Sequence, residues 1–325
     1  MIAPTRSRAA GGADARTVSL VVGGVAVTIC LVAALAQSES HAALGATVLL
    51  GLAARVAAIV AVAGVLGNLL LCLCRPRSAG AAVDGVLVAG ARGWGLVWVG
   101  ALITGFVVEL LSPRSVSAHV AVGPDDDAAA GRLRWLVLGI ALAALVRVLC
   151  SAVRTRADVT WVLGVAVAGS AVATVTGHGG SLLSPSLALV ALLAHVLAAT
   201  AWTGGLLALV VHVRSLSSPG EGGPTARAYS RLALVCYLLL AAAGVLGLVS
   251  RTDLGHLAGS GYGALVLLKV GLLLVLGVLG AAQRRTGLVR LQAGDQGRFL
   301  LLSVGELALM ATALGLGVTL AHTAS

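Results

Sequence analysis

The feature that most limits how this chain can fold is its series of long apolar runs separated by short polar segments. A helix needs about 20 mostly apolar residues to cross the hydrocarbon core of a bilayer. Nine runs approach this length, so we predict an all-α, polytopic integral membrane helical bundle with nine transmembrane helices. Their ranges are 17–35, 48–73, 93–112, 135–153, 159–176, 187–211, 232–250, 262–281 and 299–320.

The composition indicates the same class of protein. Hydrophobic residues make up 59% of the 325 residues and charged residues only 10%, whereas soluble domains carry about 25% charged residues. The 43 glycines predict helices that pack closely through small residues. The formal net charge of +10 comes mainly from loop arginines. Since no basic patch is interleaved with exposed aromatic residues, we predict no nucleic-acid partner.

Arginine placement predicts the orientation in the membrane. Fifteen arginines lie on one side of the predicted helices, and four lie on the other, namely Arg114, Arg132, Arg134 and Arg251. Because cytoplasmic loops are rich in Lys and Arg, we place the N-terminus inside and the C-terminus outside the cell inner (cytoplasmic) membrane. The run at 17–35 also has features of a signal peptide, but its apolar core is longer than the usual length of about 7–15 residues. Cleavage there would leave eight helices. Three segments are predicted as linkers because they are rich in Gly, Pro, Ser and Arg: 75–92, 112–134 and 214–230.

The histidines gather on the predicted outer side. Five lie in outer loops or at outer helix ends: His41, His119, His178, His256 and His322. His195 lies eight residues into the run 187–211, about 12 Å below the outer face, and His212 lies at the cytoplasmic end. Imidazole binds copper, zinc, nickel and iron, and it ligates haem. An ionisable residue inside a span is costly and typical of a functional site; the alternative for His195 is a hydrogen-bonding role between helices.

The residues after His195 predict a close helix contact. Trp202 follows two turns later on the same helical face, and Gly204 and Gly205 come next. Glycines permit close approach of the backbone of a second helix. This segment therefore combines a candidate ligand with a predicted packing interface.

Few charged residues lie well inside the predicted helices: Arg55, Arg147, Lys269 and Glu306. By depth, Lys269 and Arg55 belong to the outer half, and Glu306 and Arg147 belong to the inner half. An arginine of the inner half or the cytoplasmic end is therefore the favoured partner of Glu306. A structural ion pair and a place on a translocation path both remain open for these residues.

Cysteines and methionines limit the metal chemistry that the chain offers. Four cysteines lie near cytoplasmic helix ends: Cys72, Cys74, Cys150 and Cys236. The fifth, Cys30, lies in the first apolar run. The reducing side disfavours disulfides, which leaves small apolar core residues or soft-metal ligands. With two methionines, any copper route is mainly histidine-based. P-loop, HExxH and GxSxG motifs are absent, so we do not expect an enzyme.

A set of residues in the second half of the chain carries a family resemblance. In order, they are Gly177-His178, His195, Trp202, Gly204-Gly205, Tyr229-Ser230-Arg231, Gly244, Tyr262 to Lys269, Arg284-Arg285, and Arg298 leading to Glu306. This pattern resembles the copper resistance protein D family (CopD/PcoD), in the actinobacterial form without a fused CtaG-like domain. The resemblance divides the chain into N-terminal transmembrane helices, 1–160, and a CopD-like transmembrane domain, 161–325. It implies a membrane protein that moves or handles copper, with a periplasmic CopC-like carrier or a CtaG-like oxidase assembly protein as partner.

The leading hypothesis is a copper uptake or resistance permease. His178, His195 and His256 are its predicted metal ligands, and the copper ion is left without an assigned oxidation state. Glu306 and Lys269 are predicted to gate or neutralise the path of the ion. One alternative is a b-type haem membrane cytochrome, which requires a second deep histidine. Another alternative is a copper-delivery partner for cytochrome oxidase assembly.

Overall fold

The structure is a computed structural model. It describes residues 46–76, 81–111, 153–176, 187–213, 222–251, 261–287 and 296–323, with single positions between 136 and 146 and at 289 and 291, and this part of the chain is helical. No strand occurs among these residues. The predicted all-α class is therefore confirmed for this part of the chain.

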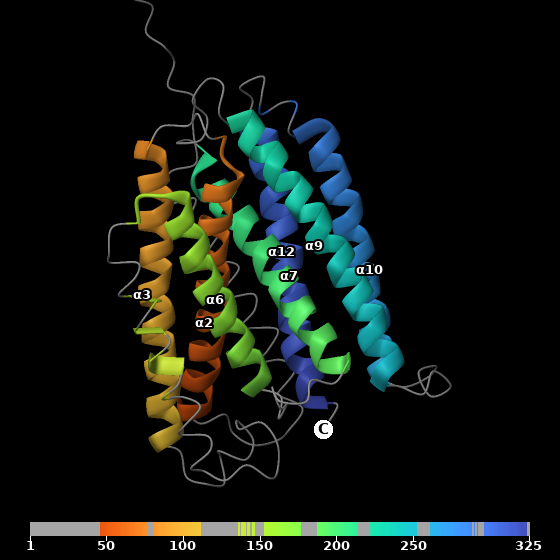
Figure 1. Cartoon of the computed structure of the whole chain (residues 1–325). Coiled ribbons are helices and arrows are strands. Elements are labelled where there is room, and N and C mark those ends of the chain that lie inside the picture. Colours follow the sequence, from red (N-terminus) through yellow and green to blue (C-terminus); the bar gives the residue numbers. More distant parts are fainter. Residues whose placement is uncertain are drawn as a thin grey trace, which may run out of the picture.

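The helices lie side by side in one bundle (Figure 1). Their bounds are α2 Ala46–Cys74, α3 Ala81–Leu111, α6 Arg156–Thr176, α7 Leu187–Val211, α9 Gly222–Arg251, α10 Gly261–Ala282, the π-helical turn η2 Gln283–Gly287, and α12 Gln296–Thr323. Figure 1 shows α2, α7 and α10 running in one direction and α3, α6, α9 and α12 in the other. The end of α7 therefore lies at the same end of the bundle as the starts of α9 and α12.

Six helices in the described residues are long and apolar enough to cross a membrane. The candidate spans are Ala53–Cys74, Gly85–Val108, Leu189–Val211, Gly223–Gly247, Val266–Gly287 and Gly297–Leu314. Such a set indicates a multi-pass membrane protein. Of the other predicted runs, 17–35 lies outside the described residues and 135–153 is described only at single positions, while α6 covers 159–176 but is not one of the six. The count of nine and the orientation of the termini thus stay predictions.

Two predicted linkers are wrong in part, because helices begin inside them. α3 begins at Ala81, within 75–92, and α9 begins at Gly222, within 214–230. The apolar run fixes only the part of a helix that matches the bilayer, whereas backbone hydrogen bonds continue wherever helix-forming residues follow. The third linker, 112–134, lies outside the described residues.

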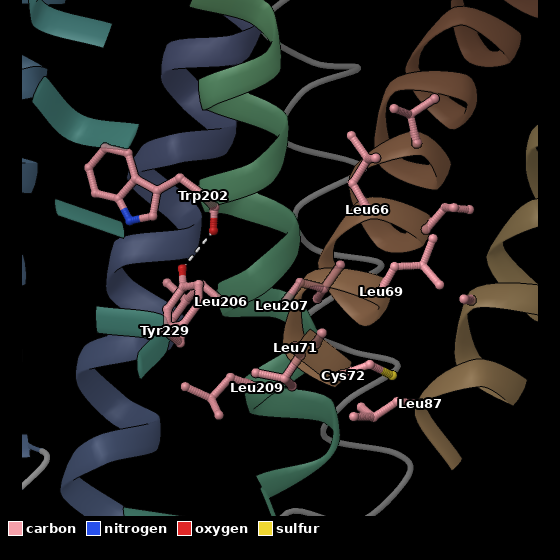
Figure 2. Packing of buried hydrophobic residues seen from close by; sticks show 14 of the residues in the cluster. Leu66, Leu69, Leu71, Cys72, Leu87, Trp202, Leu206, Leu207, Leu209 and Tyr229 are labelled. Carbon is pink, nitrogen blue, oxygen red and sulfur yellow. Dashed lines mark hydrogen bonds between the residues drawn. The ribbon is translucent and has the colours of Figure 1, made fainter. Parts of the chain in front are cut away.

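The core is centred on α2 and α7. α2 packs against α3, α6 and α7, and α7 packs in turn against α9. Leu66 and Leu69 on α2 are almost fully buried and lie across from Leu207 on α7 (Figure 2). The division placed at residue 160 falls inside α6, and helices from both sides of it share this core.

Polar contacts fix the start of α6 against the end of α2. The Arg156 guanidinium donates hydrogen bonds to the carbonyl oxygens of Leu73, at 3.3 Å, and Arg75. The last carbonyls of a helix lack partners within the helix, so Arg156 satisfies two acceptors at the end of α2. The contact joins two arginine-bearing helix ends on one side of the bundle.

Candidate functional site

His195 points into the bundle. It lies on α7, is half-buried, and its ring is within hydrogen-bonding reach of the Leu240 carbonyl oxygen on α9. The ring also interacts electrostatically with Lys269 on α10. His195 therefore faces the space between α7, α9 and α10, where polar groups from two other helices approach it.

Trp202 connects α7 with α9 and α12. Its buried indole meets Tyr237 edge to face, with ring centroids 5.9 Å apart and an interplanar angle of 87°. The Tyr229 hydroxyl donates a hydrogen bond of 2.7 Å to the Trp202 carbonyl oxygen (Figure 2). The indole N–H in turn donates to the Glu306 carboxyl group. Three residues singled out from the sequence, Trp202, Tyr229 and Glu306, thus meet in one polar cluster between α7, α9 and α12.

Glu306 is a carboxyl group deep in the bundle, with 4% of its surface exposed. Besides Trp202, it interacts electrostatically with Arg284 of η2. This agrees with the depth argument, which favoured an inner-half or cytoplasmic-end arginine over Lys269. Arg147 is outside the described residues.

A small cavity adjoins Glu306. Its volume is about 70 Å³, and its walls come from α7, α9, α10, η2 and α12. The polar and charged side chains that line it include Tyr229, Gln283, Arg284 and Glu306. The Gln283 amide nitrogen donates to the Ser303 hydroxyl at 2.7 Å and to the Phe299 carbonyl oxygen at 3.3 Å.

The two adjacent glycines of α7 face different helices. A Cβ atom at Gly204 would overlap the carbonyl oxygen of Ala63 on α2, and one at Gly205 would overlap the ring of Tyr229 on α9. The predicted role of these glycines in close helix approach is therefore confirmed. This packing of the two glycines places Trp202 against α9 and α12.

Other predicted site residues lie elsewhere. Arg231 and Arg298 are exposed and do not line the cavity, and Tyr262 lies in the first turn of α10, where its side chain is not described. His178 and His256 lie outside the described residues. Within the described part of the chain, no three His, Cys, Asp or Glu side chains are close enough to hold a metal ion. The histidine ligand set stays a prediction.

Two residues of the polar cluster were missed from the sequence, Gln283 and Ser303. Ser303 lies three residues before Glu306, so the two share one face of a helix, and this spacing was the available signal. Gln283 directly follows the predicted end of a span, where a polar residue is expected at the membrane surface. The cysteines Cys72 and Cys236 are buried in the apolar core, as small apolar residues are.

These observations define a multi-pass helical membrane protein with a buried carboxyl site between its C-terminal helices. The family model of copper resistance protein D matches residues 223–320, which run from the start of α9 into α12 and include Tyr229, Lys269 and Glu306. Over these residues the chain is similar to the copper resistance protein D family. His195 and Trp202 precede the matched residues. No curated protein and no solved structure matches the chain significantly.

Proposed function

We propose that this protein is a copper permease of the cytoplasmic membrane, which carries copper in uptake or resistance and binds it through histidines on the outer side. The observation that carries the proposal is His195, an imidazole turned into the bundle against helices of a copper resistance protein D domain. A membrane-embedded imidazole is costly unless it serves an interaction. Copper is among the ions that imidazole binds well.

The helix ends support a common outer position for the three predicted ligands. The start of α7, the end of α9 and the start of α10 lie at one end of the bundle (Figure 1). His178 precedes α7 by nine residues, and His256 belongs to the segment that joins α9 to α10. His195 lies eight residues into α7, about 12 Å along the helix from that end. An ion captured at this end would meet His195 next.

Lys269 affects how strongly copper is retained at His195. Its ammonium group has the same sign of charge as copper and interacts with His195. Like charges at such a site disfavour each other, so Lys269 weakens retention of the ion and favours its onward movement. A periplasmic CopC-like carrier or a CtaG-like oxidase assembly protein is the proposed partner.

The direct test is the copper content of cells that express His195→Ala. Copper is measured by mass spectrometry in washed cells with equal amounts of membrane-inserted protein. The control is His212→Ala, which removes an imidazole from the other end of the same helix. We expect His195→Ala to return copper content to that of cells lacking the protein, and His212→Ala to retain the wild-type change. Unaltered copper content in His195→Ala would refute the role of His195.

A further inference from the structure

The cavity beside Glu306 lies away from the histidines, in the half of the bundle that contains the starts of α9 and α12. His195 does not line it. The cavity, at about 70 Å³, is large enough to hold water. It is therefore a second candidate site, separate from His195 and large enough for water molecules.

Two buried side chains indicate what this site takes. Glu306 presents a carboxyl group with 4% exposure, and Gln283 is 8% exposed. The Gln283 Oε1 atom is buried and has no hydrogen-bond partner. A buried acceptor without a donor is unfavourable, and a water molecule in the adjoining cavity would supply the donor. The site thus combines a titratable group with an acceptor suited to ordered water.

Few charged or titratable side chains besides Glu306 line the cavity. Tyr229 and Tyr237 come from α9, and Arg284 comes from η2. α7 contributes the non-titrating Trp202, and α10 contributes apolar residues. Arg284 is half-buried and the next residue, Arg285, is exposed, so the lining extends from the buried carboxyl group toward the arginine-rich end of the bundle.

We propose that Glu306 is a proton-exchange site, and that the proton bound there is the coupling ion for copper movement. In the deprotonated state, the carboxylate faces the Arg284 guanidinium and the pair is neutral. When a proton is taken up, the O–H bond forms on Glu306 and the pair carries one positive charge. On release, this bond breaks and the proton passes to water in the cavity, with no change of oxidation state.

The coupling follows from charge. A copper ion that approaches the inner half of the bundle favours the deprotonated carboxyl group, and its departure allows the proton to return. Copper and proton therefore alternate. This coupling rests on the proposed copper transport, whereas proton exchange by Glu306 does not depend on it.

The first experiment is infrared difference spectroscopy of the purified full-length protein as the pH is changed. We expect a carboxylic acid C=O band that appears and disappears with pH and is lost in Glu306→Gln. Asp158→Asn, which removes an exposed carboxyl group, retains the band. Glu306→Asp keeps a carboxyl group and gives a shifted band, which serves if Glu306→Gln does not fold. A spectrum that is the same in wild type and Glu306→Gln, or unshifted in Glu306→Asp, would overturn the assignment.

The second experiment measures copper and proton movement in liposomes that contain a pH-sensitive dye. Addition of copper ions to wild-type liposomes changes the internal pH, and Glu306→Gln reduces this change to that of protein-free liposomes. Copper movement with an unaltered pH change in Glu306→Gln would overturn the coupling. If the wild type moves no copper, both the copper proposal and the coupling fail, while the infrared result still decides proton exchange at Glu306.

Discussion

Gly67 on α2 and Gly204 on α7 bring their helices into backbone contact. A Cβ atom at Gly67 would overlap the carbonyl oxygen of Gly204, and one at Gly204 would overlap that of Ala63. Neither helix could approach so closely with a larger residue at the crossing. The contact fixes the rotation of α7, which turns Gly205 and Trp202 toward α9 and α12. The polar cluster around Glu306 therefore depends on a glycine crossing on the other side of α7.

Gly204→Ala should destabilise the protein. The added methyl group meets backbone, which cannot rotate away, and such overpacking costs about 1–3 kcal/mol. The matched control is Gly244→Ala on α9, where a Cβ atom meets nothing within 4 Å. That change should be neutral or stabilising by about 0.5–1 kcal/mol, because alanine favours a helix over glycine. Thermal unfolding in detergent measures both, and equal midpoints would contradict the crossing.

Tyr229→Phe separates the hydroxyl hydrogen bond from ring packing. Phenylalanine keeps the ring against Gly205 and loses the bond to the Trp202 carbonyl oxygen. We expect a loss of about 0.5–1.5 kcal/mol. Tyr229→Ala also removes the buried ring and should cost about 3–5 kcal/mol. Denaturant unfolding of the two variants gives the comparison, and an equal loss in both would show that ring packing contributes nothing.

The sequence predicted the helices best where apolar residues begin and end abruptly. The run 187–211 coincides with α7, and 262–281 differs from α10 by one residue at each end. α9 differs because its first turns, from Gly222 to Arg231, contain Pro, Arg and Ser and do not look membrane-spanning. Helix length is set by backbone hydrogen bonding as well as by bilayer thickness. As a result, Tyr229 lies inside a helix, although the sequence placed it within the predicted linker 214–230.

The candidate site was predicted only in part, because its geometry depends on helix rotation. The two-turn spacing from His195 to Trp202 and the depth of Glu306 follow directly from the sequence. The contact of Trp202 with Glu306 depends on how α7 and α12 are turned, and apolar periodicity gives no such angle in a helix that is apolar on every side. Gln283 was missed for another reason, because it follows the predicted end of a span, where a polar residue is expected at the membrane surface.

The start of α6 predicts a pH-dependent contribution to stability. Asp158 accepts hydrogen bonds from the backbone N–H groups of Thr155, at 2.8 Å, and Arg154, at 3.0 Å. These bonds hold the pKa of Asp158 below its usual value of 3.8. A group whose pKa is lower in the folded state than in the unfolded state stabilises the folded protein. This contribution is complete above the pKa of the unfolded state, and it disappears as the pH falls through the pKa of the folded state. Asp158→Ala should therefore lower the melting temperature at pH 7, and the difference should shrink toward zero in strong acid. A constant difference would contradict this.

Lys269 provides the sharpest test of the charge environment at His195. Under the proposed function, its ammonium group repels copper held by the imidazole, and removing one such charge is worth about 1–2 kcal/mol, or roughly ten-fold in affinity. Lys269→Gln should therefore bind copper roughly ten-fold more tightly, as measured by titration of the purified protein. Lys269→Arg keeps the positive charge and should bind as the wild type does. Tighter binding should also slow release, so Lys269→Gln should move less copper in liposomes while it retains more. Weaker binding in Lys269→Gln than in Lys269→Arg would mean that Lys269 supports the ion at His195 instead of repelling it.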